Sequence, residues 1–487
     1  MAERRLPLWW TCGPFFDIGH LGSAGTPGAS LRPRRLTWGL SALLRYSSPI
    51  AVAALMSLAP AALRSQSGAD SALVSYIAGI KAVDSHAHPM RYVGVGTPPD
   101  SEYDALPLDA IPPFQVPWRL RPDNPQWRQA QRALFGPLSP ETGAAYSSAL
   151  ARAKARIVTE QAQRFPTWVL DQTGIDVMLA NRIVLGEGLA SPRFRWVPFA
   201  DPLMFPLDSR NAAARTPDTR SLYPKEDALL RRYLRDLGLS RIPATLDTYV
   251  ASVIRPTLAR QRQGGAVAIK FEAAYLRALD FDPPDPAAAR RVYGRYSAGG
   301  TPTNADYKLV QDYLFRLICR EAGRLGMAVQ IHLLEGFGGF YSPRGSAPRL
   351  LESALNDSTL RATNFVIVHG GWPLIGETQS LLARSNVFAD ISAMVLIVDP
   401  GRLAQVLRQW LAEWPEKVLF GSDAFDGGPE QGWAEVAWVG TTTARRALAE
   451  ALTGMMRSGD LDRARAQEVA RMVMRQNAIE AYHLAAQ

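Results

Sequence analysis

AVDSHAH, at residues 82–88, is the stretch of this sequence that predicts most about its fold. His86 and His88 are two residues apart and follow a short apolar run. On an extended strand, residues two apart point to the same face, so one strand end can offer two imidazoles to one metal ion. Two histidines alone make a poor site, because a metal such as zinc takes three or four protein ligands. Further ligands are therefore expected elsewhere in the chain.

Four more residues of ligand type each follow an apolar run: Lys270 after 266–269, His332 after 327–331, His369 after 365–368 and Asp423 after 417–422. Four of the six histidines of the chain thus lie at such places. A (β/α)8 barrel carries its reactive side chains at the C-terminal ends of buried parallel strands. The pattern predicts one site assembled from the ends of several strands.

Eight strand-like segments are separated by helical segments. We expect the strands at about 80–84, 175–180, 194–199, 266–271, 327–332, 365–369, 387–391 and 418–420. We expect the helices at about 140–164, 224–237, 244–263, 304–324 and 441–486, with Asn304 as the N-cap of the fourth. Apolar strands that alternate with helices predict a parallel sheet covered on both faces, and eight of them predict a closed (β/α)8 TIM barrel. The length of 487 residues fits one such barrel with helical and loop insertions.

Long loops are expected to build the pocket above the strand ends, at 89–140, 272–303, 333–348 and 424–437. The first is rich in proline and aromatic residues, and we expect it to form an irregular roof. Apolar residues make up 47% of the chain and the mean hydropathy is −0.09, as in a globular enzyme. The net charge of +9 is concentrated in residues 1–68, where seven arginines accompany two acidic residues. The rest of the surface is only mildly basic, so nucleic-acid binding is not expected.

Residues 1–68 do not resemble part of the barrel. Several arginines precede an apolar run at 50–63, which contains a small-residue Ala-Pro-Ala motif. This order is typical of an export signal, and the run is too short to span a bilayer, which takes about 20 residues. We expect 1–68 to be an extension with an export signal, and 69–487 to be the barrel with C-terminal helices. The protein would then be periplasmic or secreted; the alternative is a disordered extension of a cytoplasmic protein.

Taken together, the motifs resemble the metal-dependent amidohydrolase superfamily, in its amidohydrolase-related (amidohydrolase 2 type) branch. The matching positions are the Asp-x-His-x-His motif at 84–88, Lys270, His332, the His-Gly-Gly-Trp-Pro motif at 369–373 and the Gly-Ser-Asp motif at 421–423. The resemblance implies a bare barrel with no flanking β-sandwich domain. It also implies a divalent metal cofactor, with zinc as the expected ion and one or two ions per site.

The resemblance implies six metal ligands, namely His86, His88, Lys270, His332, His369 and Asp423. The first two histidines and Asp423 would hold one ion, and His332 and His369 a second. Lys270 would bridge both as a carbamate formed with carbon dioxide. In mononuclear members of similar enzymes, the histidine of strand 5 binds the metal, that of strand 6 is an acid/base, and the lysine is usually absent. The presence of Lys270 favours two ions, although it could instead form an ion pair with Glu272 or bind a substrate carboxylate.

The expected activity is hydrolysis of an amide, or of a related C–N or ester bond, by metal-activated hydroxide. Asp423 would take a proton from the attacking water and pass it to the leaving group. The alternative is a mononuclear decarboxylase of the same branch, in which His369 is the catalytic acid/base. A carboxylate at Asp84 either orients an imidazole or caps the adjacent loop.

Three residues are candidates for substrate binding, namely Tyr275, Arg277 and Trp372. Arg277 could pair with a substrate carboxylate or form a surface ion pair. Trp372 and Trp433 could line the pocket or pack in the core. We expect a small-molecule substrate, no nucleic-acid partner, no integral membrane segment and, by analogy with similar barrels, a homo-oligomer as one option.

Overall fold

The computed structural model describes residues 68–94, 96–107, 110, 115–139, 142–334 and 342–485. The expected export signal lies outside these residues. From Ala69 onwards the chain forms a unit by itself. In the described part, no helix is long and apolar enough to cross a membrane.

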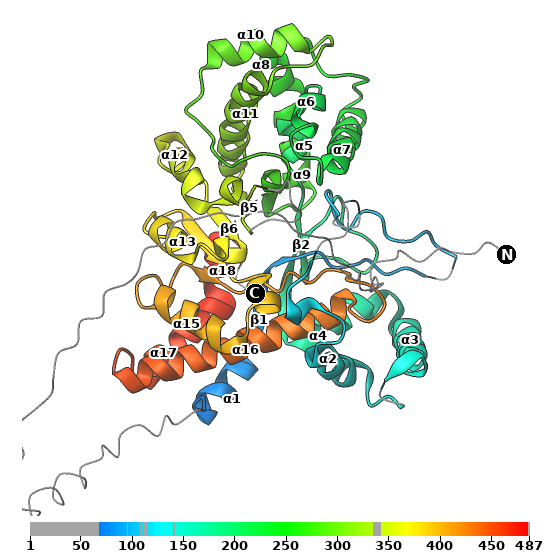
Figure 1. Cartoon of the computed structure of the whole chain (residues 1–487), viewed down its shortest axis with the longest axis vertical. Helices are drawn as coiled ribbons and strands as arrows, with labels where there is room; N and C mark the ends of the chain where they lie inside the picture. The colour runs from blue at the N-terminus through cyan, green and yellow to red at the C-terminus, as the bar shows by residue number, and fades with distance from the viewer. Residues whose placement is uncertain are drawn as a thin grey trace, which may run out of the picture. The chain divides into compact units, whose positions relative to one another are not determined.

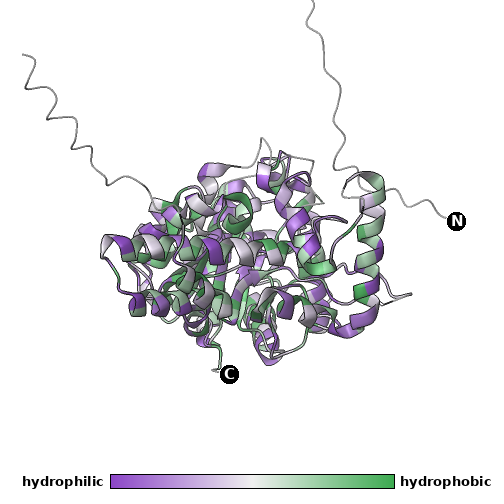
Figure 2. Ribbon diagram, turned by 90° about the horizontal axis from the view of Figure 1, so that it is seen from below, coloured by the Kyte–Doolittle hydropathy of each residue, from purple (hydrophilic) through white to green (hydrophobic). Residues whose placement is uncertain are grey.

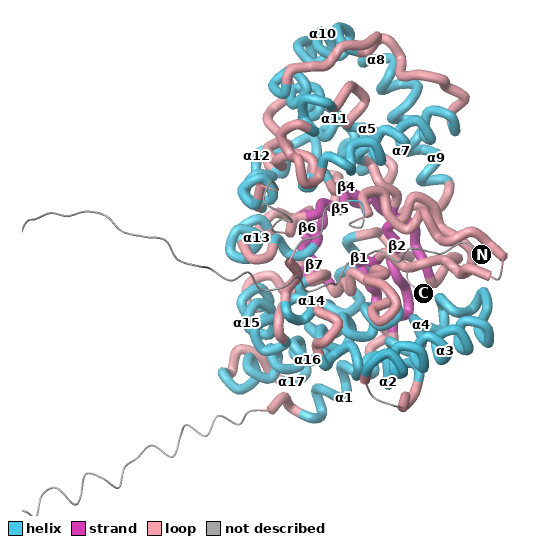
Figure 3. The backbone as a smooth tube through the Cα atoms, turned by 45° about the vertical axis from the view of Figure 1, so that its right-hand side comes forward, coloured by secondary structure: helices cyan, strands magenta, loops and turns pink. Residues whose placement is uncertain are grey.

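Eight parallel strands lie at the centre of the described residues (Figure 3). They are β1 (Ala82–Ala87), β2 (Ile175–Asn181), β3 (Phe194–Val197), β4 (Ala268–Phe271), β5 (Ala328–His332), β6 (Phe365–Val368), β7 (Val387–Asp390) and β8 (Val418–Leu419). Each strand pairs in parallel with the next within two groups, β1-β2-β3 and β4-β5-β6-β7-β8. Parallel neighbours in chain order are the arrangement that a (β/α)8 barrel requires.

Backbone hydrogen bonds join the two groups of strands at both edges. Between β3 and β4, the N–H of Lys270 donates to the carbonyl of Pro198 at 2.8 Å. Between β8 and β1, the N–H of Ser85 donates to the carbonyl of Phe420 at 2.9 Å, and the N–H of Asp423 donates to His86 at 2.8 Å. The predicted (β/α)8 barrel is therefore the fold that the structure has.

Helices surround the strands, and those on the outside carry hydrophilic residues beside apolar ones (Figures 1 and 2). They are α1 (Ser71–Gly79), α2 (Pro125–Phe135), α3 (Gly143–Gln161), α4 (Phe165–Thr173), α5 (Asp201–Met204), α6 (Arg210–Ala213), α7 (Tyr223–Asp236), α8 (Leu246–Tyr249), α9 (Arg255–Gln263), α10 (Pro286–Tyr296), α11 (Asn304–Arg324), α12 (Glu352–Leu355), α13 (Ile375–Leu381), α14 (Met394–Ile397), α15 (Pro400–Leu411), α16 (Trp433–Ser458), α17 (Arg463–Arg471) and α18 (Asn477–Ala481). The helices thereby cover the outer face of the barrel, and apolar side chains of the strands pack on one another inside it.

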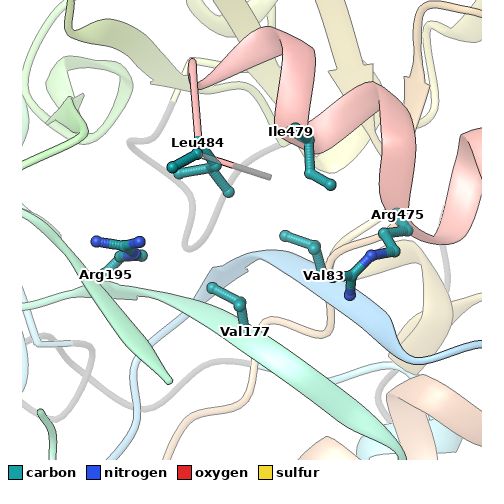
Figure 4. A pocket seen from close by; sticks show the side chains of 7 residues that line it. Val83, Val177, Arg195, Arg475, Ile479 and Leu484 are labelled. Carbon is teal, nitrogen blue, oxygen red and sulfur yellow. The ribbon is translucent and has the colours of Figure 1, made fainter. Parts of the chain in front are cut away.

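The C-terminal segment closes the end of the barrel where the strands begin. Ala478 and Tyr482 belong to a core cluster with apolar side chains from all eight strands. Figure 4 shows Ile479 and Leu484 facing Val83 of β1 and Val177 of β2 around a small pocket at this end. Because the C-terminal segment fills this end of the barrel, the site is expected at the opposite end, where the strands end at the ligand-type residues.

The structure corrects several expected boundaries. The proline-rich stretch 89–140 is not wholly irregular, because it contains α2, which Asn124 caps by accepting a hydrogen bond from the N–H of Gln126. The N-cap of α11 is Thr303 rather than Asn304, and its hydroxyl accepts from the N–H of Asp306. The C-terminal helical region begins at Trp433, and α1 had no prediction. Side-chain caps mark the starts of α2 and α11, which the periodicity of the residues does not locate.

Candidate metal centre

His86, His88 and Asp423 bring three ligand atoms together at the junction of β1 and β8. The Nε2 atom of His86 lies 3.2 Å from Oδ1 of Asp423, and the Nε2 atom of His88 lies 4.0 Å from the same oxygen. All three ligand atoms are within 4.8 Å of one another. Ligands about 2.1 Å from an ion are at most about 4.2 Å apart, so an inward movement of less than about 1 Å would complete the coordination.

Burial keeps the imidazoles of this cluster neutral. His86 is fully buried and His88 is 6% exposed. Burial lowers the pKa of His86 well below its usual value, and it also lowers the pKa of His88. A neutral imidazole keeps a lone pair for a cation. The Asp423 side chain is 16% exposed, so this carboxylate is the member of the cluster that solvent reaches.

Gln330 fixes which nitrogen of His86 faces the cluster. Its amide nitrogen donates to the carbonyl of Ser85 at 2.7 Å and to the hydroxyl of Tyr482 at 2.8 Å. Its oxygen therefore faces Nδ1 of His86, at 3.4 Å, and must accept a hydrogen bond from that nitrogen. The lone pair of His86 is left at Nε2, next to Asp423.

Asp84 holds the loop that carries Asp423. Its Oδ1 atom accepts from the N–H of Ser422 at 2.9 Å, and its Oδ2 atom accepts from the Ser422 hydroxyl. Of the two roles considered for Asp84, the structure shows the loop-holding one. Burial raises the pKa of Asp84 to about 7. Asp423 itself has a φ of +53°, a left-handed backbone conformation that the neighbouring contacts must stabilise.

His332 and His369 form a second pair, at the ends of β5 and β6. The Nδ1 atom of His332 lies 3.1 Å from Nε2 of His369. The Nδ1 atom of His369 lies 2.9 Å from the hydroxyl of Ser392, which donates its own proton to Asp390. Burial lowers the pKa of both imidazoles well below the usual value.

These contacts determine which ring nitrogen of His332 and of His369 carries the proton. The Ser392 hydroxyl donates to the Asp390 carboxylate, so it must accept from Nδ1–H of His369. The neutral His369 ring then has its lone pair at Nε2, where it accepts from Nδ1–H of His332. The remaining lone pair is at Nε2 of His332, and among the described residues this buried atom has no hydrogen-bond partner. A buried nitrogen in this state fits a cation.

Lys270 lies between the two pairs of histidines. Its fully buried side chain places Nζ 3.4 Å from Nε2 of His86 and 3.5 Å from Oε1 of Glu272. The contact with Glu272 is one of the two alternatives to the carbamate. A charged ammonium beside the lone pair of His86 would oppose a cation at the same atom.

The three predicted substrate-binding residues lie in different surroundings. The ring of Tyr275 is 4.4 Å from that of His332, centre to centre, so Tyr275 lies at the site. Arg277 donates to Asp312 at 2.7 Å and also stacks on Phe281, which places its guanidinium in an ion pair within the protein. The guanidinium of Arg402 lies over the ring of Trp372, with its Cζ atom 4.7 Å from the centre of that ring.

Trp433, the other aromatic candidate, packs in the core. It is 5% exposed and lies edge-on to Phe165 at 6.2 Å. Sequence reasoning missed Gln330, Ser392 and Asp104, whose Oδ2 atom lies 3.5 Å from Nδ1 of His88. Gln330 was detectable, because it is two residues before His332 and points to the same face of β5.

A family model described as "Amidohydrolase" matches residues 240–484, half of the chain. The chain belongs to the amidohydrolase family. The matched range contains four of the six expected ligands, and β1 supplies the other two. The resemblance found in the sequence is thus confirmed, and with it a metal-dependent superfamily. No curated protein matches the sequence.

Solved structures share the fold at low sequence identity. Glucuronate isomerase from Caulobacter crescentus is 13% identical with a TM-score of 0.54, covering 85% of this chain and 94% of that one. Uronate isomerase from Thermotoga maritima is 13% identical with a TM-score of 0.52, covering 84% and 96%. A provisionally named metal-dependent hydrolase from Lactobacillus casei is 15% identical with a TM-score of 0.53, covering 85% and 98%. At these identities the likeness concerns the barrel alone.

Proposed function

We propose that this amidohydrolase-family protein is a metal-dependent hydrolase that cleaves an amide, a related C–N bond or an ester in a small molecule. The observation that carries the proposal is the position of Asp423, whose Oδ1 atom faces both imidazoles of β1. A divalent cation, with zinc as the expected ion, would supply a Lewis acid that activates water and polarises a carbonyl group. His86, His88 and Asp423 would hold it, with His332 nearby.

Asp423 has the properties of a proton carrier for hydrolysis. It is the partly exposed member of an otherwise buried cluster, so water and substrate can reach its carboxylate. It can accept the proton of an attacking water and return it to the departing nitrogen or oxygen, which keeps the proton count balanced. Tyr275, packed on His332, is placed to contact the substrate beside the histidine pair.

The two-ion version of this proposal assigns Lys270 as a carbamate. Conversion of the amine to a carbamate would replace a cation beside His86 with an anion, and it would free Glu272 from its 3.5 Å contact. The Lys270 carbamate and Nε2 of His332, whose lone pair has no hydrogen-bond partner among the described residues, would then be able to hold a second ion.

Two observations favour the alternative, a mononuclear decarboxylase. Lys270 already has a carboxylate neighbour in Glu272, as expected if it stays an amine. Ser392 also holds His369 in the tautomer whose lone pair is at Nε2, the nitrogen through which an acid/base would take up and release a proton. In that version His332 binds the single ion and His369 transfers the proton.

We further propose that the protein is periplasmic or secreted, which fractionation of cells and N-terminal sequencing of the mature chain would test.

Metal content and a substrate screen test the proposal together. The full chain is loaded with zinc, and the number of ions bound per chain is measured by inductively coupled plasma mass spectrometry. The loaded protein is then assayed on amides, esters and aromatic carboxylic acids. We expect hydrolysis of at least one amide or ester, lost on chelation and restored by zinc. Decarboxylation without hydrolysis would put the alternative first. A chain that binds no metal after reconstitution would overturn both.

A further inference from the structure

A second group of ligand atoms lies on the other edge of the His88 ring. It consists of His88, Asp104 and Glu272, whose ligand atoms are all within 4.8 Å of one another. Asp104 comes from the loop after β1, and its Oδ2 atom is 3.5 Å from Nδ1 of His88. Glu272 comes from the end of β4 and is 3% exposed. The ligand atoms of this group, like those of His86, His88 and Asp423, are thus close enough together to surround one small ion.

The negative charges of this group are balanced only in part, by the ammonium of Lys270. Oε1 of Glu272 is 3.5 Å from the Lys270 ammonium, and within the described ranges Oε2 of Glu272 has no hydrogen-bond partner. A buried carboxylate without a partner is costly, and two carboxylates this close need a cation or a proton between them. The Asp104 side chain is 15% exposed, so an ion can enter from the solvent.

We propose that His88, Asp104 and Glu272 form a second divalent-cation site, which competes with the first for His88. The donor set of one imidazole and two carboxylates suits Mn²⁺ or Zn²⁺. A neutral imidazole has one lone pair, so His88 serves the first site through Nε2 or the second through Nδ1. Occupation of the second site therefore withdraws a ligand from the first, and excess cation inhibits the enzyme.

Size argues against an organic cation as the occupant. Three ligand atoms within 4.8 Å of one another enclose a single ion of small radius, and leave no room for a substituted ammonium group between them. The proposal depends on these three residues and not on the reaction. A binding measurement can therefore succeed or fail whatever the substrate proves to be.

The test is a titration of the metal-stripped full chain with Mn²⁺, in which the free ion is followed by electron paramagnetic resonance. We expect the wild type to bind one Mn²⁺ in a weaker class, in addition to its tighter binding, and we compare it with the variant Asp104→Asn. We expect the affinity of this weaker class to fall about tenfold or more in the variant, while the tighter binding is retained. Glu272→Gln should give the same loss, which keeps the test valid if Asp104→Asn does not fold.

The matched control is Glu102→Gln. Glu102 is on the same loop, but its carboxylate pairs with Arg232, so this variant should bind Mn²⁺ as the wild type does. Identical titrations for wild type and Asp104→Asn would overturn the proposal. The carboxylates of Asp104 and Glu272 would then share a proton and not a metal ion. Loss of all binding in Asp104→Asn would also overturn it, since Asp104 would then act only by orienting His88 in the first site.

Discussion

The hydroxyl of Ser392 lies 2.9 Å from Nδ1 of His369 and donates its proton to Asp390. The backbone N–H of His369 also donates to Asp390, at 2.8 Å, so one carboxylate holds both the ring and the main chain of this histidine. His369 has a φ of +65°, which a non-glycine residue adopts only where its surroundings impose it. Asp390 and Ser392, at the end of β7, thus determine the orientation of the His369 ring at the end of β6.

The first prediction concerns Ser392→Ala. Without the hydroxyl, Nδ1 of His369 loses its acceptor, the ring can flip or change its tautomer, and the lone pair at Nε2 of His332 is no longer assured. We expect zinc affinity or kcat to fall about 10- to 100-fold. Ser392→Thr keeps the hydroxyl and should recover most of the loss. If the two variants lose the same activity, packing at residue 392 matters and the hydrogen bond does not.

The second prediction concerns Asp423→Asn. An amide binds a cation more weakly than a carboxylate and cannot accept a proton, so both the ligand and the proton carrier are lost. We expect kcat to fall about 100- to 10,000-fold even when the enzyme is saturated with zinc. Asp460→Asn, in a surface ion pair with Arg408, is the control and should leave kcat unchanged. Normal turnover by Asp423→Asn would assign the proton transfer to another residue.

The ligand-type residues could be found from the sequence because each stands at the end of a strand-forming run. Side chains alternate between the two faces of a strand, so His86 and His88 were predictable as a pair, and the apolar runs located the other strand ends. The loop between β1 and α2 follows no such period. Its position is fixed by a buried ion pair. In this pair, Arg182 donates to both oxygens of Asp100 at 2.9 Å.

For the same reason Asp104 could not be assigned to the site in advance, because the Arg182–Asp100 contact that positions its loop spans 82 residues of sequence. Arg277 is a residue for which the sequence left two partners open. An arginine just after β4 suggests a substrate carboxylate, but the structure supplies the carboxylate of Asp312 from α11. Which partner a long charged side chain finds depends on packing between helices, which the local sequence does not contain.

The third prediction concerns Lys270→Ala in the two-ion version of the enzyme. Loss of the bridging group should lower bound zinc from two ions to one and reduce activity about 10- to 100-fold. Before mutation, protein equilibrated with carbon-13 bicarbonate should show a carbamate signal by nuclear magnetic resonance that Lys270→Ala lacks. Lys308→Ala, a lysine in a partly exposed ion-pair network, is the control. A wild type with one ion and no carbamate signal would support the decarboxylase alternative.

The fourth prediction concerns the pH dependence of the metal-free protein. Burial, followed by the charge of His369, lowers the pKa of His332 well below the usual 6.5, so the folded state stays unprotonated where the unfolded state binds a proton. Stability contributed by the neutral ring is therefore present above pH 6.5 and is lost as the pH falls. His332→Gln removes this contribution. Relative to the variant, the wild-type free energy of unfolding should fall by up to about 1.4 kcal/mol per pH unit below about pH 6.5.

Chemical denaturation of both proteins at a series of pH values, after removal of metal, measures this difference. Using the difference cancels the opposite trend of buried acids such as Asp84, whose raised pKa of about 7 makes stability fall as the pH rises. Zinc should raise the wild-type free energy of unfolding but leave the difference in slope in place, because a bound ion also keeps His332 unprotonated in the folded state. If the difference between the two proteins does not change with pH, His332 is protonated equally in the folded and unfolded states and is not held as a neutral ligand.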